Sequence, residues 1–402
     1  MKSSRVLGVL PNLLAIQRQN GRVVLERRFL SGMEEYAKYW DGELLAIMEP
    51  APESELETNQ DRTLAGDNVE VDPRELKFQL AVVDYRSKAL KEQLSRCTLA
   101  LGGLQYRQVH LADWARAAKV PLIYITEYTL QTRIQIIRAN GGNPLRLARR
   151  VSWEANQERL NRHAVKTADG IQCNGTPTFD AYRHLSPNPL LFFDGRMTED
   201  QLVPEARLEV RLAELKKRPT LRLVFAGRIN KMKGVDQLVE VGRILTEMDV
   251  PYALDIYGGG VLADEVRGTI EASGLSGQVH LKGHVPFAEL MPKLQSDYDL
   301  FICCHPQGDP AMAYLEMLAC GLPIIGYGNE ALSGILARSN VGQTVPIHDN
   351  ELLCRVVRDL VDNRQQIAEW SRTGLNFAKT HTFDRTFQRR IEHVEDVIRA
   401  HG

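Results

Sequence analysis

Cysteine is scarce in this sequence, and its spacing excludes two kinds of site. The chain has six cysteines, with neither the paired spacing of a zinc site nor the density of a disulfide scaffold. We therefore expect reduced, buried thiols at Cys97, Cys173, Cys303, Cys304, Cys320 and Cys354.

A long apolar run and a large net charge are also missing. No apolar stretch reaches the roughly 18 residues that a membrane-spanning helix needs. Basic side chains number 50 and acidic ones 51, and this balance argues against binding nucleic acid through bulk charge.

The first residues do not have the pattern of a signal peptide. Their apolar run is interrupted by Pro11 and Asn12 and lacks a small-residue cleavage site, so it predicts a first strand. We expect a cytoplasmic protein. A second hypothesis is that it contacts the inner face of the membrane peripherally.

The chain length and pattern predict two α/β domains. A chain of 402 residues exceeds the usual limit for one hydrophobic core. Short apolar runs bounded by glycine or proline alternate with stretches of helical period, which is typical of parallel sheets covered by helices. In the first half this pattern predicts helices at 25–39 and 144–166, and strands near 5–10, 43–48, 78–84, 98–102, 121–126 and 170–174.

A second alternation begins at residue 219, after a charged stretch. Its strands are LRLVFAG, YALDIYG, VHLKG, LFICCH and PIIGY, and the chain is helical in pattern beyond residue 350. We expect an N-terminal lobe at 1–204, a linker at 205–218, a C-terminal lobe at 219–380 and a last helix within 381–402. The acidic segment 51–72 has no sustained period and predicts a solvated loop.

The segment LRLVFAGRINKMKGVDQL has the pattern of an anion site. A buried strand ends in Gly227 and leads through a basic loop into a helix, and ligands of parallel sheets bind at that end of the strands. Arg228 and Lys233 flank the loop and can hold a diphosphate by charge-assisted hydrogen bonds, while Gly227 and Gly234 allow tight turns. The alternative is a solvated basic loop.

The segment LFICCHPQGDPAMAYLEMLACGLPIIGY carries a carboxylate near a strand end. We expect a helix to begin near Pro310, which puts Glu316 in its second turn. A carboxylate there can accept both hydroxyls of a ribose, although a surface glutamate has the same pattern. The amides of Ala311 and Met312 at that helix start are candidates to support a phosphate.

Together these motifs resemble the retaining glycosyltransferases of family 4. The resemblance rests on FAGR-x4-KG, a strand ending in YGGG, a strand ending in GHV, and an acid within LEMLACGLPII, and it covers residues 221–382, with the first half matching in outline only. It implies the GT-B fold, in which two Rossmann-like lobes face each other across a deep cleft and the last helix returns to the N-terminal lobe. It also implies transfer of a sugar from a nucleoside-diphosphate sugar to a glycan or lipid-linked acceptor in bacterial-type polysaccharide or cell-surface glycan synthesis.

The resemblance implies roles for individual residues. Arg228 and Lys233 match the family's contacts to the donor diphosphate, and Glu316 matches the acid that binds the ribose. Gly258 and Gly259 match the turn whose backbone approaches the phosphate or sugar.

The sequence departs from the family pattern at the first of two acids. The family's first acid lies eight residues before the second, where this chain has Gly308, and the nearest acid is Asp309. Asp309 is therefore a catalytic and donor-binding candidate, but an aspartate before Pro310 is also a good helix N-cap. His284 ends a strand and is a candidate neighbour of the donor base, or else a packed core histidine.

The first lobe offers three weaker candidates. Glu127 follows the strand at 121–126, where many relatives have a histidine that approaches the transferred sugar. Gly21 and Arg22 lie in a loop that resembles in position the relatives' glycine-rich loop near donor and acceptor, or form an ordinary turn. Gly102-Gly103 carries the same two interpretations.

Two further motifs match known cofactor or metal sites in form, but their contexts do not support such a site. Gly258-x-Gly260-x-x-Ala263 formally matches a dinucleotide fingerprint, but the acid expected about 20 residues on is replaced by Gln278. Asp297-Tyr298-Asp299 matches the metal-binding Asp-x-Asp of glycosyltransferases with another fold, yet it directly precedes a buried strand and we expect it to be structural. We therefore expect neither a metal nor another cofactor, with the nucleotide sugar as co-substrate.

A basic stretch in the first lobe is a candidate partner surface. Its apolar and basic side chains can contact anionic lipid head groups or an acidic glycan, or form a solvated helix face. The arginines of this segment, 133–150, are Arg133, Arg138, Arg146, Arg149 and Arg150.

Two alternatives to a transferase stay open. One is a nucleotide-sugar epimerase of the same fold, and the other a non-catalytic nucleotide-sugar-binding protein. For the transferase, no second carboxylate is clearly placed for double displacement, so front-face attack assisted by the leaving phosphate fits better.

Overall fold

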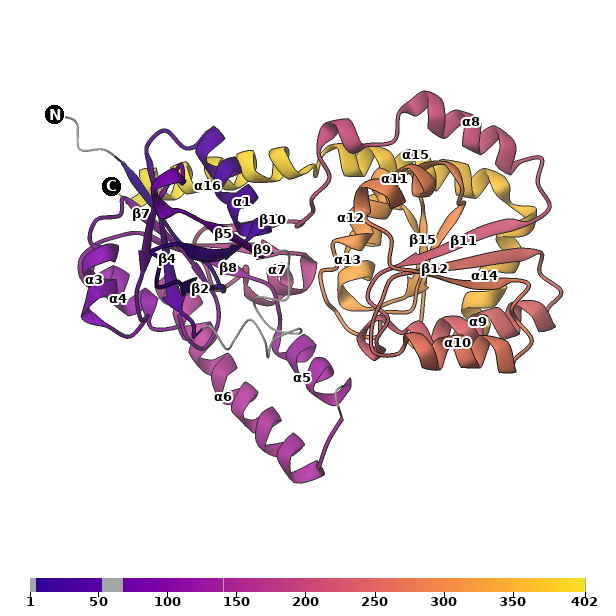
Figure 1. Ribbon diagram of the computed structural model, residues 1–402, viewed down its shortest axis with the longest axis horizontal. Helices are drawn as coiled ribbons and strands as arrows, with labels where there is room; N and C mark the ends of the chain where they lie inside the picture. Colours follow the sequence, from indigo (N-terminus) through magenta and orange to yellow (C-terminus); the bar gives the residue numbers. More distant parts are fainter. Residues whose placement is uncertain (1–4, 53–67, 140, 402) are drawn as a thin grey trace.

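Two α/β lobes lie side by side in the computed structural model, which describes residues 5–52, 68–139 and 141–401 (Figure 1). Most of the segment 51–72, predicted to be a solvated loop, lies outside these described residues. The last two helices run along the molecule, α15 on the second lobe and α16 on the first (Figure 1).

The sheet of the first lobe has a parallel centre and an antiparallel margin. Its order is β10-β9-β8-β7-β1-β4-β2-β3-β5, and β6 pairs with β4. The six strands expected from the sequence are present, whereas β2, β3, β5 and β10 were not predicted. The strands are β1 Val6–Leu10, β2 Leu14–Gln17, β3 Val23–Glu26, β4 Glu43–Pro50, β5 Asn68–Val71, β6 Gln79–Val82, β7 Leu99–Gly103, β8 Leu122–Thr126, β9 Gly170–Asn174 and β10 Pro189–Phe192.

Helices cover both faces of this sheet, so each face buries an apolar core. One core is built with side chains of α3, α4 and α6, and the other with α1 and α16. The first-lobe helices are α1 Arg27–Tyr39, η1 Pro73–Glu75, α3 Lys88–Leu94, α4 Leu111–Ala118, α5 Leu130–Ala139, α6 Pro144–Thr167 and α7 Thr176–Tyr182. Figure 1 shows α5 and the N-terminal half of α6 projecting from the lobe as a helical arm.

The sheet of the second lobe is parallel throughout its described strands, in the order β13-β12-β11-β14-β15-β16. Because parallel strands are buried on both faces, they are short, continuous apolar runs, which is why the sequence predicted most of them well. They are β11 Leu221–Ala226, β12 Tyr252–Tyr257, β13 Val279–Gly283, β14 Leu300–Cys303, β15 Ile324–Tyr327 and β16 Gly342–Val345.

The helices of the second lobe share one apolar core with this sheet. They follow the strands in a repeating strand–helix order that brings all strand ends to one edge. They are η3 Lys231–Lys233, α9 Val235–Glu247, α10 Ala263–Ala272, α11 Phe287–Ser296, α12 Ala313–Ala319, α13 Glu330–Ser339, α14 Asn350–Asp362 and α15 Arg364–Lys379.

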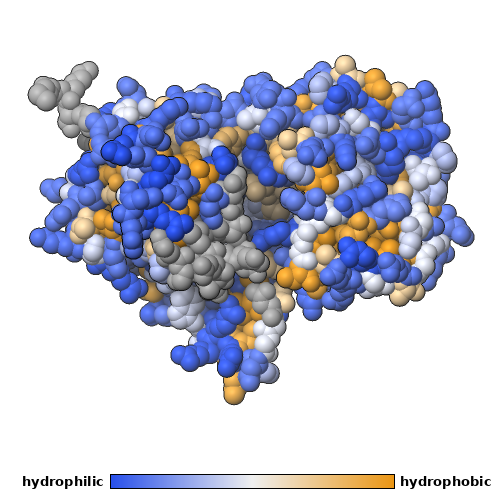
Figure 2. Space-filling view, in the orientation of Figure 1, coloured by the Kyte–Doolittle hydropathy of each residue, from blue (hydrophilic) through white to orange (hydrophobic). Residues whose placement is uncertain are grey.

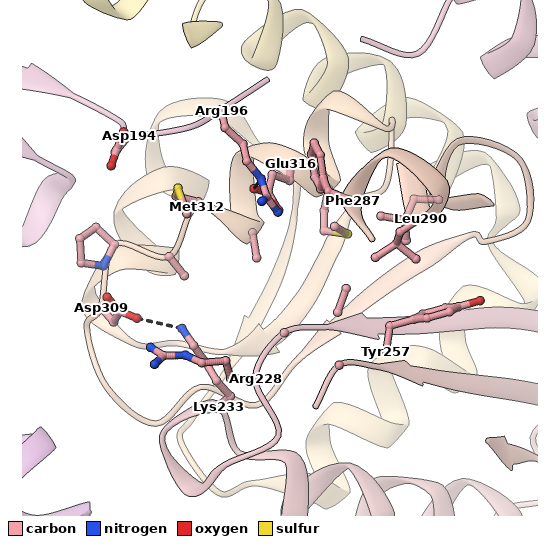
Figure 3. A pocket seen from close by; sticks show the side chains of 18 of the residues that line it. Asp194, Arg196, Arg228, Lys233, Tyr257, Phe287, Leu290, Asp309, Met312 and Glu316 are labelled. Atoms are coloured by element: carbon pink, nitrogen blue, oxygen red, sulfur yellow. Dashed lines mark hydrogen bonds and ion pairs between the residues drawn. The ribbon is translucent and has the colours of Figure 1, made fainter. Parts of the chain in front are cut away.

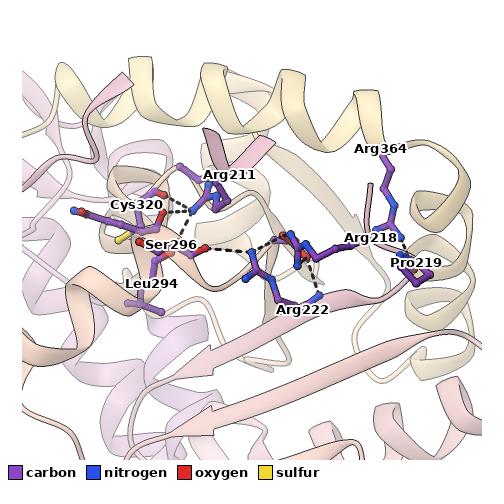
Figure 4. A network of polar contacts seen from close by, with 11 residues as sticks. Arg211, Arg218, Pro219, Arg222, Leu294, Ser296, Cys320 and Arg364 are labelled. Atoms are coloured by element: carbon purple, nitrogen blue, oxygen red, sulfur yellow. Dashed lines mark hydrogen bonds and ion pairs between the residues drawn. The ribbon is translucent and has the colours of Figure 1, made fainter. Parts of the chain in front are cut away.

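The segment predicted as a linker, 205–218, is mostly a helix of the second lobe. It forms α8 (Glu205–Leu215), and Leu208, Leu212 and Leu215 are buried in the second core. Arg211 of α8 is also buried and donates hydrogen bonds to four backbone carbonyls near the ends of α11 and α12 (Figure 4). The connection between the lobes therefore lies earlier, between β10 and α8, and includes η2 (Glu199–Gln201).

The last helix, α16 (Phe383–His401), returns to the first lobe as expected. Its Phe387, Ile391 and Val394 are buried in the core that α1 helps to build, and the ring of Phe387 lies 4.8 Å from that of Tyr36. A second connection thus joins the lobes near residues 380–382.

The six cysteines and Asp299 of the Asp-x-Asp motif are buried in the fold. All six cysteines are buried and unpaired. Asp299 is 2% exposed and accepts hydrogen bonds from the Arg218 side chain at 2.9 Å and the Arg222 amide at 2.8 Å, so it fixes the start of β11 (Figure 4). No helix in the described part of the chain is long and apolar enough to cross a membrane.

Candidate active site

A cavity of about 610 Å³ lies between the two lobes and is lined by both. Figure 2 shows the hollow between the lobes from one side. The cavity collects, from separate segments, every candidate that the sequence placed at the donor or the reaction: Glu127, Gly227, Arg228, Lys233, Gly258, Gly259, His284, Asp309, Ala311, Met312 and Glu316.

The basic loop after β11 is held by close backbone packing. Gly234 has φ +60°, and a Cβ there would lie 2.0 Å from the carbonyl oxygen of Cys304, so only glycine fits. Gly258 has φ +138°, and a Cβ there would lie 1.8 Å from the carbonyl oxygen of Gly227. The side chain of Asn230 accepts a hydrogen bond from the amide of Lys233 at 3.1 Å, which fixes the turn that carries this lysine.

The two cations of the loop that line the cavity differ in their partners (Figure 3). Lys233 Nζ donates to Asp309 Oδ2 at 2.8 Å, and both side chains are mostly buried. Arg228 is exposed to the cavity, and its guanidinium has no hydrogen bond or ion pair with any residue in the described ranges. The loop therefore presents to the cavity one uncompensated cation, and a second whose charge is balanced by a carboxylate.

The expectation that Asp309 begins a helix is wrong. Helix α12 begins at Ala313, its N-cap is Met312, and no side chain caps it. Asp309 instead forms a turn in which its carbonyl accepts the amide of Ala311 at 2.7 Å. The Ala311 amide, one of two expected to support a phosphate, is thus engaged, and Glu316 lies in the first turn rather than the second.

The chain is closely packed around Gly308, where the family pattern has its first acid. A Cβ there would lie 3.0 Å from Glu330 Oε2 and 3.3 Å from Thr132 Oγ1. The amide of Gly308 donates to Gln135 Oε1 at 3.1 Å, so α5 of the first lobe is close against this loop. A carboxylate at position 308 would have to displace these neighbours.

Glu316 and Arg228 reach the same cavity from opposite walls (Figure 3). The Glu316 carboxylate is bound by Arg196, with Arg196 Nε to Glu316 Oε1 at 2.7 Å and Nη2 to Oε2 at 3.5 Å. The guanidinium of Arg196 lies 3.6 Å from the ring centroid of Phe287. Arg196 belongs to the connection between the lobes, so the carboxylate predicted to bind a ribose is oriented from outside its own domain.

The first-lobe wall has an acidic cluster at the ends of β8 and β10. Glu127 lies near Asp194, and Arg28 makes an ion pair with Asp194. Desolvation by the surrounding protein, followed by repulsion from Asp194, raises the pKa of Glu127 to about 7. Its side chain is still open to water in the cavity. This carboxyl can therefore carry or release a proton near neutral pH.

The two histidines at strand ends have different environments. His284 lines the cavity, whereas His305 is 1% exposed and hydrogen-bonds Tyr314 at 3.3 Å. Burial, followed by repulsion from the cation of Lys233, lowers the pKa of His305 well below its usual value. His305 is therefore a packed core histidine.

The glycine loop of the first lobe is not part of this cavity. Gly21 and Arg22 lie in the β2–β3 turn, where the Arg18 amide donates to the Arg22 carbonyl at 2.8 Å and Arg22 Nε lies 3.2 Å from Glu70 Oε1. They form a hairpin turn, so their predicted acceptor role has no support from the cavity lining. Gly103 packs against Asn12 and does not line the cavity either.

Several lining residues were missed by sequence reasoning. Arg28 is the second residue of α1 and carries no motif, and Phe287 begins α11. Asp194 and Arg196 could have been found, because they directly follow β10 at the functional edge of the sheet. That strand was not predicted, so its end could not be searched. In the described part of the chain, no group of three or more His, Cys, Asp or Glu side chains could hold a metal ion.

Solved structures share this architecture over nearly the whole chain. HepE of Anabaena in complex with UDP has a TM-score of 0.66 at 12% identity, covering 98% of this chain and 99% of that one. Sucrose-phosphate synthase of Thermosynechococcus elongatus has a TM-score of 0.63 at 14% identity, covering 98% and 100%. WaaG, a glycosyltransferase involved in lipopolysaccharide biosynthesis, has a TM-score of 0.56 at 13% identity, covering 96% and 99%. The fold is thus the two-lobed GT-B fold.

Sequence comparison relates the second lobe to glycosyl transferases. Residues 208–377 match the family model of glycosyl transferases, group 1. D-inositol 3-phosphate glycosyltransferase of Paenarthrobacter aurescens is 24% identical over 183 residues, which is 44% of this chain and 45% of that protein. The match therefore spans less than half of that relative. The resemblance is confirmed at the level of a group 1 glycosyl transferase region, while membership of family 4 and retention stay predictions.

Proposed function

We propose that the protein transfers a sugar from a nucleoside-diphosphate sugar to a hydroxyl of a glycan or lipid-linked acceptor. The observation that carries this proposal is the convergence of Arg228, Lys233 and Glu316 on one interlobe cavity. Two cations suit a diphosphate, a carboxylate suits a ribose, and the first-lobe wall leaves the opposite side for an acceptor.

In this proposal, electrostatic stabilisation of the leaving group drives the reaction. Charge grows on the leaving diphosphate as the bond to the sugar breaks, and fixed cations stabilise that charge more than the ground state. Arg228 is the stronger candidate because no other group in the described chain neutralises it. When the donor binds, Lys233 would release Asp309 and bind the phosphate, or it would bind both groups.

We further propose that Asp309 and Glu127 contact the transferred sugar, from opposite sides. Asp309 is held by Lys233, and Glu127 faces it across the cavity, close enough for its pKa to be affected by Asp309. Retention by front-face attack, with the leaving phosphate taking the acceptor proton, fits a site in which Glu127 carries a proton part of the time. His284 and the turn at Gly258 and Gly259 would lie along the donor.

The proposal includes metal independence and a cytoplasmic enzyme of polysaccharide or cell-surface glycan synthesis. Arg228 and Lys233 would do what a divalent ion does elsewhere, namely neutralise the diphosphate. Treatment with a chelator should therefore leave the rate unchanged, and restoration of a lost rate by added magnesium or manganese would overturn this part.

The direct test is a panel of nucleotide sugars. A true donor raises the unfolding temperature by mass action, and with acceptor hydroxyls present the nucleoside diphosphate is released in step with a glycoside. Isomerised donor without acceptor would favour the epimerase alternative. Donor binding without release or transfer, across a broad acceptor set, would favour the non-catalytic alternative.

Membrane contact through the arm of α5 and α6 is a second proposal, favoured by one observation. The tip of the arm is hydrophobic in Figure 2, and Leu145 near the start of α6 is 81% exposed. Arg138 and Arg146 of the same arm are exposed, and their side chains have no hydrogen bond or ion pair with a residue that the structure describes. Arg133, in contrast, is tied to Glu154 at 2.7 Å and Glu158 at 2.9 Å and is not available. Leu145→Ser should reduce sedimentation with anionic vesicles, while equal sedimentation would contradict the contact.

A further inference from the structure

The first lobe has a second cavity, outside the interlobe cleft. It has a volume of about 650 Å³ and lies where β1, β4 and β7 end, closed on one side by α6. Residues 11–14 follow β1, Glu49 is near the end of β4, and residues 105–107 follow β7. Since the carboxyl ends of parallel strands share one sheet edge, this cavity lies on the same edge as Glu127.

The two cavities are neighbours along that edge. Strand β7 pairs directly with β8, and Glu127 follows β8. The two cavities therefore lie at the ends of neighbouring strands of one sheet, and their linings share no residue. A chain molecule held in the second cavity would have to pass along this edge to reach the interlobe cavity.

Aromatic rings form part of the second cavity although they are exposed. Tyr106 is 43% exposed and Trp153 is 49% exposed, and their ring centroids lie 5.7 Å apart at an interplanar angle of 72°. Large rings left open to water at a recess indicate a binding surface. The C–H faces of a sugar ring are suited to pack on such rings.

The charges of this cavity do not cancel. Glu49 is paired with Arg107, and Glu154 with Arg133. Arg149 and Arg150 line the same cavity, are exposed, and have no hydrogen bond or ion pair with the residues that the structure describes. Both acids are therefore neutralised, and two guanidinium groups remain for an anion.

We propose that this cavity binds a negatively charged sugar chain, with Trp153 and Tyr106 packing on sugar rings and Arg149 and Arg150 binding its carboxylate or phosphate groups. The inference rests on the proposed function, because it makes this chain the acceptor whose end reaches the interlobe cavity. A recess with a paired aromatic wall favours a sugar chain over a flat lipid surface, which the exposed tip of the arm would meet instead.

The test is a binding titration with a galacturonic acid hexamer, followed by Trp fluorescence and by calorimetry. Native protein should bind the acidic hexamer at least tenfold more tightly than its fully methyl-esterified form. Arg149→Gln combined with Arg150→Gln should weaken binding about tenfold, as should Trp153→Ala, because each removes one kind of contact. Trp153→Phe should retain most of the affinity.

The matched control is Arg138→Gln combined with Arg146→Gln. These two arginines are exposed on the same helical arm, have no partner in the described ranges, and lie outside the cavity lining, so the net charge changes equally. The control should bind the hexamer as native protein does. A loss equal to that of the cavity variant would mean non-specific charge attraction and would overturn the proposal.

Separate titration with UDP keeps the two proposals distinguishable. Variants of the second cavity should bind UDP normally. If UDP binds but the acidic hexamer does not, or binds no better than its ester, the inference fails while the donor site stands. Loss of anionic vesicle binding in the Arg149/Arg150 variant, without hexamer binding, would overturn it in favour of a membrane surface. If the hexamer binds as predicted but neither UDP nor any nucleotide sugar of the panel binds, the donor proposal fails.

Discussion

Arg228 and Lys233, the two cations that we propose to bind a diphosphate, differ in their existing partners. Lys233 is already paired with Asp309, so exchanging that partner for a phosphate gains little net charge compensation. Arg228 lies open in the cavity without a partner in the described chain, and its planar fork suits a phosphate. Most of the new electrostatic stabilisation should therefore come from Arg228.

Substitution of Arg228 tests this difference. Arg228→Ala should lower kcat/KM about 100-fold or more, since removal of one preorganised charge donor from an active site has effects of about 10²–10³. Its unfolding temperature should stay near that of native protein, because the side chain is exposed. Steady-state kinetics beside a thermal scan check both points, and unchanged turnover would exclude Arg228 from the reaction.

Glu127 should make stability depend on pH in a defined direction. Its pKa is raised in the folded state from 4.5 to about 7, so the folded protein binds more protons than the unfolded chain between these values. The free energy of unfolding should therefore fall as pH rises from about 4.5 through about 7. Glu127→Gln removes this effect.

The measurement is urea denaturation of both proteins at about pH 5 and pH 8. Native protein should lose more stability than Glu127→Gln on going to the higher pH. Glu34→Gln, which changes an exposed acid of α1, is the control and should follow native protein. Parallel curves for Glu127→Gln and native protein would contradict the shifted pKa.

At the scale of elements, one buried arginine of α8 links this helix to the C-terminal ends of α11 and α12. Arg211 is 4% exposed, and its guanidinium donates to the carbonyls of Leu294, Gln295, Cys320 and Gly321. Burial lowers its pKa to about 10, which leaves it charged at neutral pH. Its hydrogen bonds hold the ends of α11 and α12, and α12 carries Glu316.

Loss of the Arg211 side chain should lower the free energy of unfolding. Arg211→Ala leaves four carbonyls unpaired and opens a cavity, so we expect a loss of about 3 kcal/mol in the free energy of unfolding of the second lobe. Arg207→Ala, one turn earlier on the exposed face of α8, should cost less than about 1 kcal/mol. Chemical denaturation compares the two, and equal losses would contradict the role of Arg211.

Sequence patterns predicted those elements whose apolar residues form continuous runs. The central strands of both sheets and the motif residues around Arg228 were found, because a buried parallel strand followed by a glycine is visible in one sequence. The hairpin β2–β3 and strand β10 are short and partly exposed, and α8 is amphipathic but strongly charged, so it was taken for a linker. The start of α12 was misplaced because Asp309 pairs with Lys233, a contact 76 residues distant that no local rule can anticipate.

At the scale of the whole molecule, the proposed donor site includes residues from outside the second lobe. Arg196 lies on the connection between the lobes and binds Glu316, while α5 of the first lobe closes against Gly308. Movement of the lobes would therefore change both the ribose side and the sugar side of the site. Arg196 is in this account a positioning residue for Glu316.

Arg196→Ala should weaken nucleotide binding selectively. Without the guanidinium, the Glu316 carboxylate loses its orientation, so we expect about tenfold weaker binding of UDP and unchanged binding of inorganic pyrophosphate. Arg196→Lys should restore part of the loss. Calorimetric titration of both ligands separates this from a structural defect, because a damaged lobe would weaken both equally.

The central claim is that the cationic loop after β11 binds the second phosphate of the donor. The measurement that tests it most directly is the ratio of UDP to UMP affinity, by calorimetry, in native protein, Arg228→Ala and Lys231→Ala. Lys231 lies three residues further along the same loop but outside the cavity lining. We predict a ratio of about tenfold or more in native protein and Lys231→Ala, falling towards one in Arg228→Ala. A ratio that persists in Arg228→Ala, or falls equally in Lys231→Ala, would contradict the account.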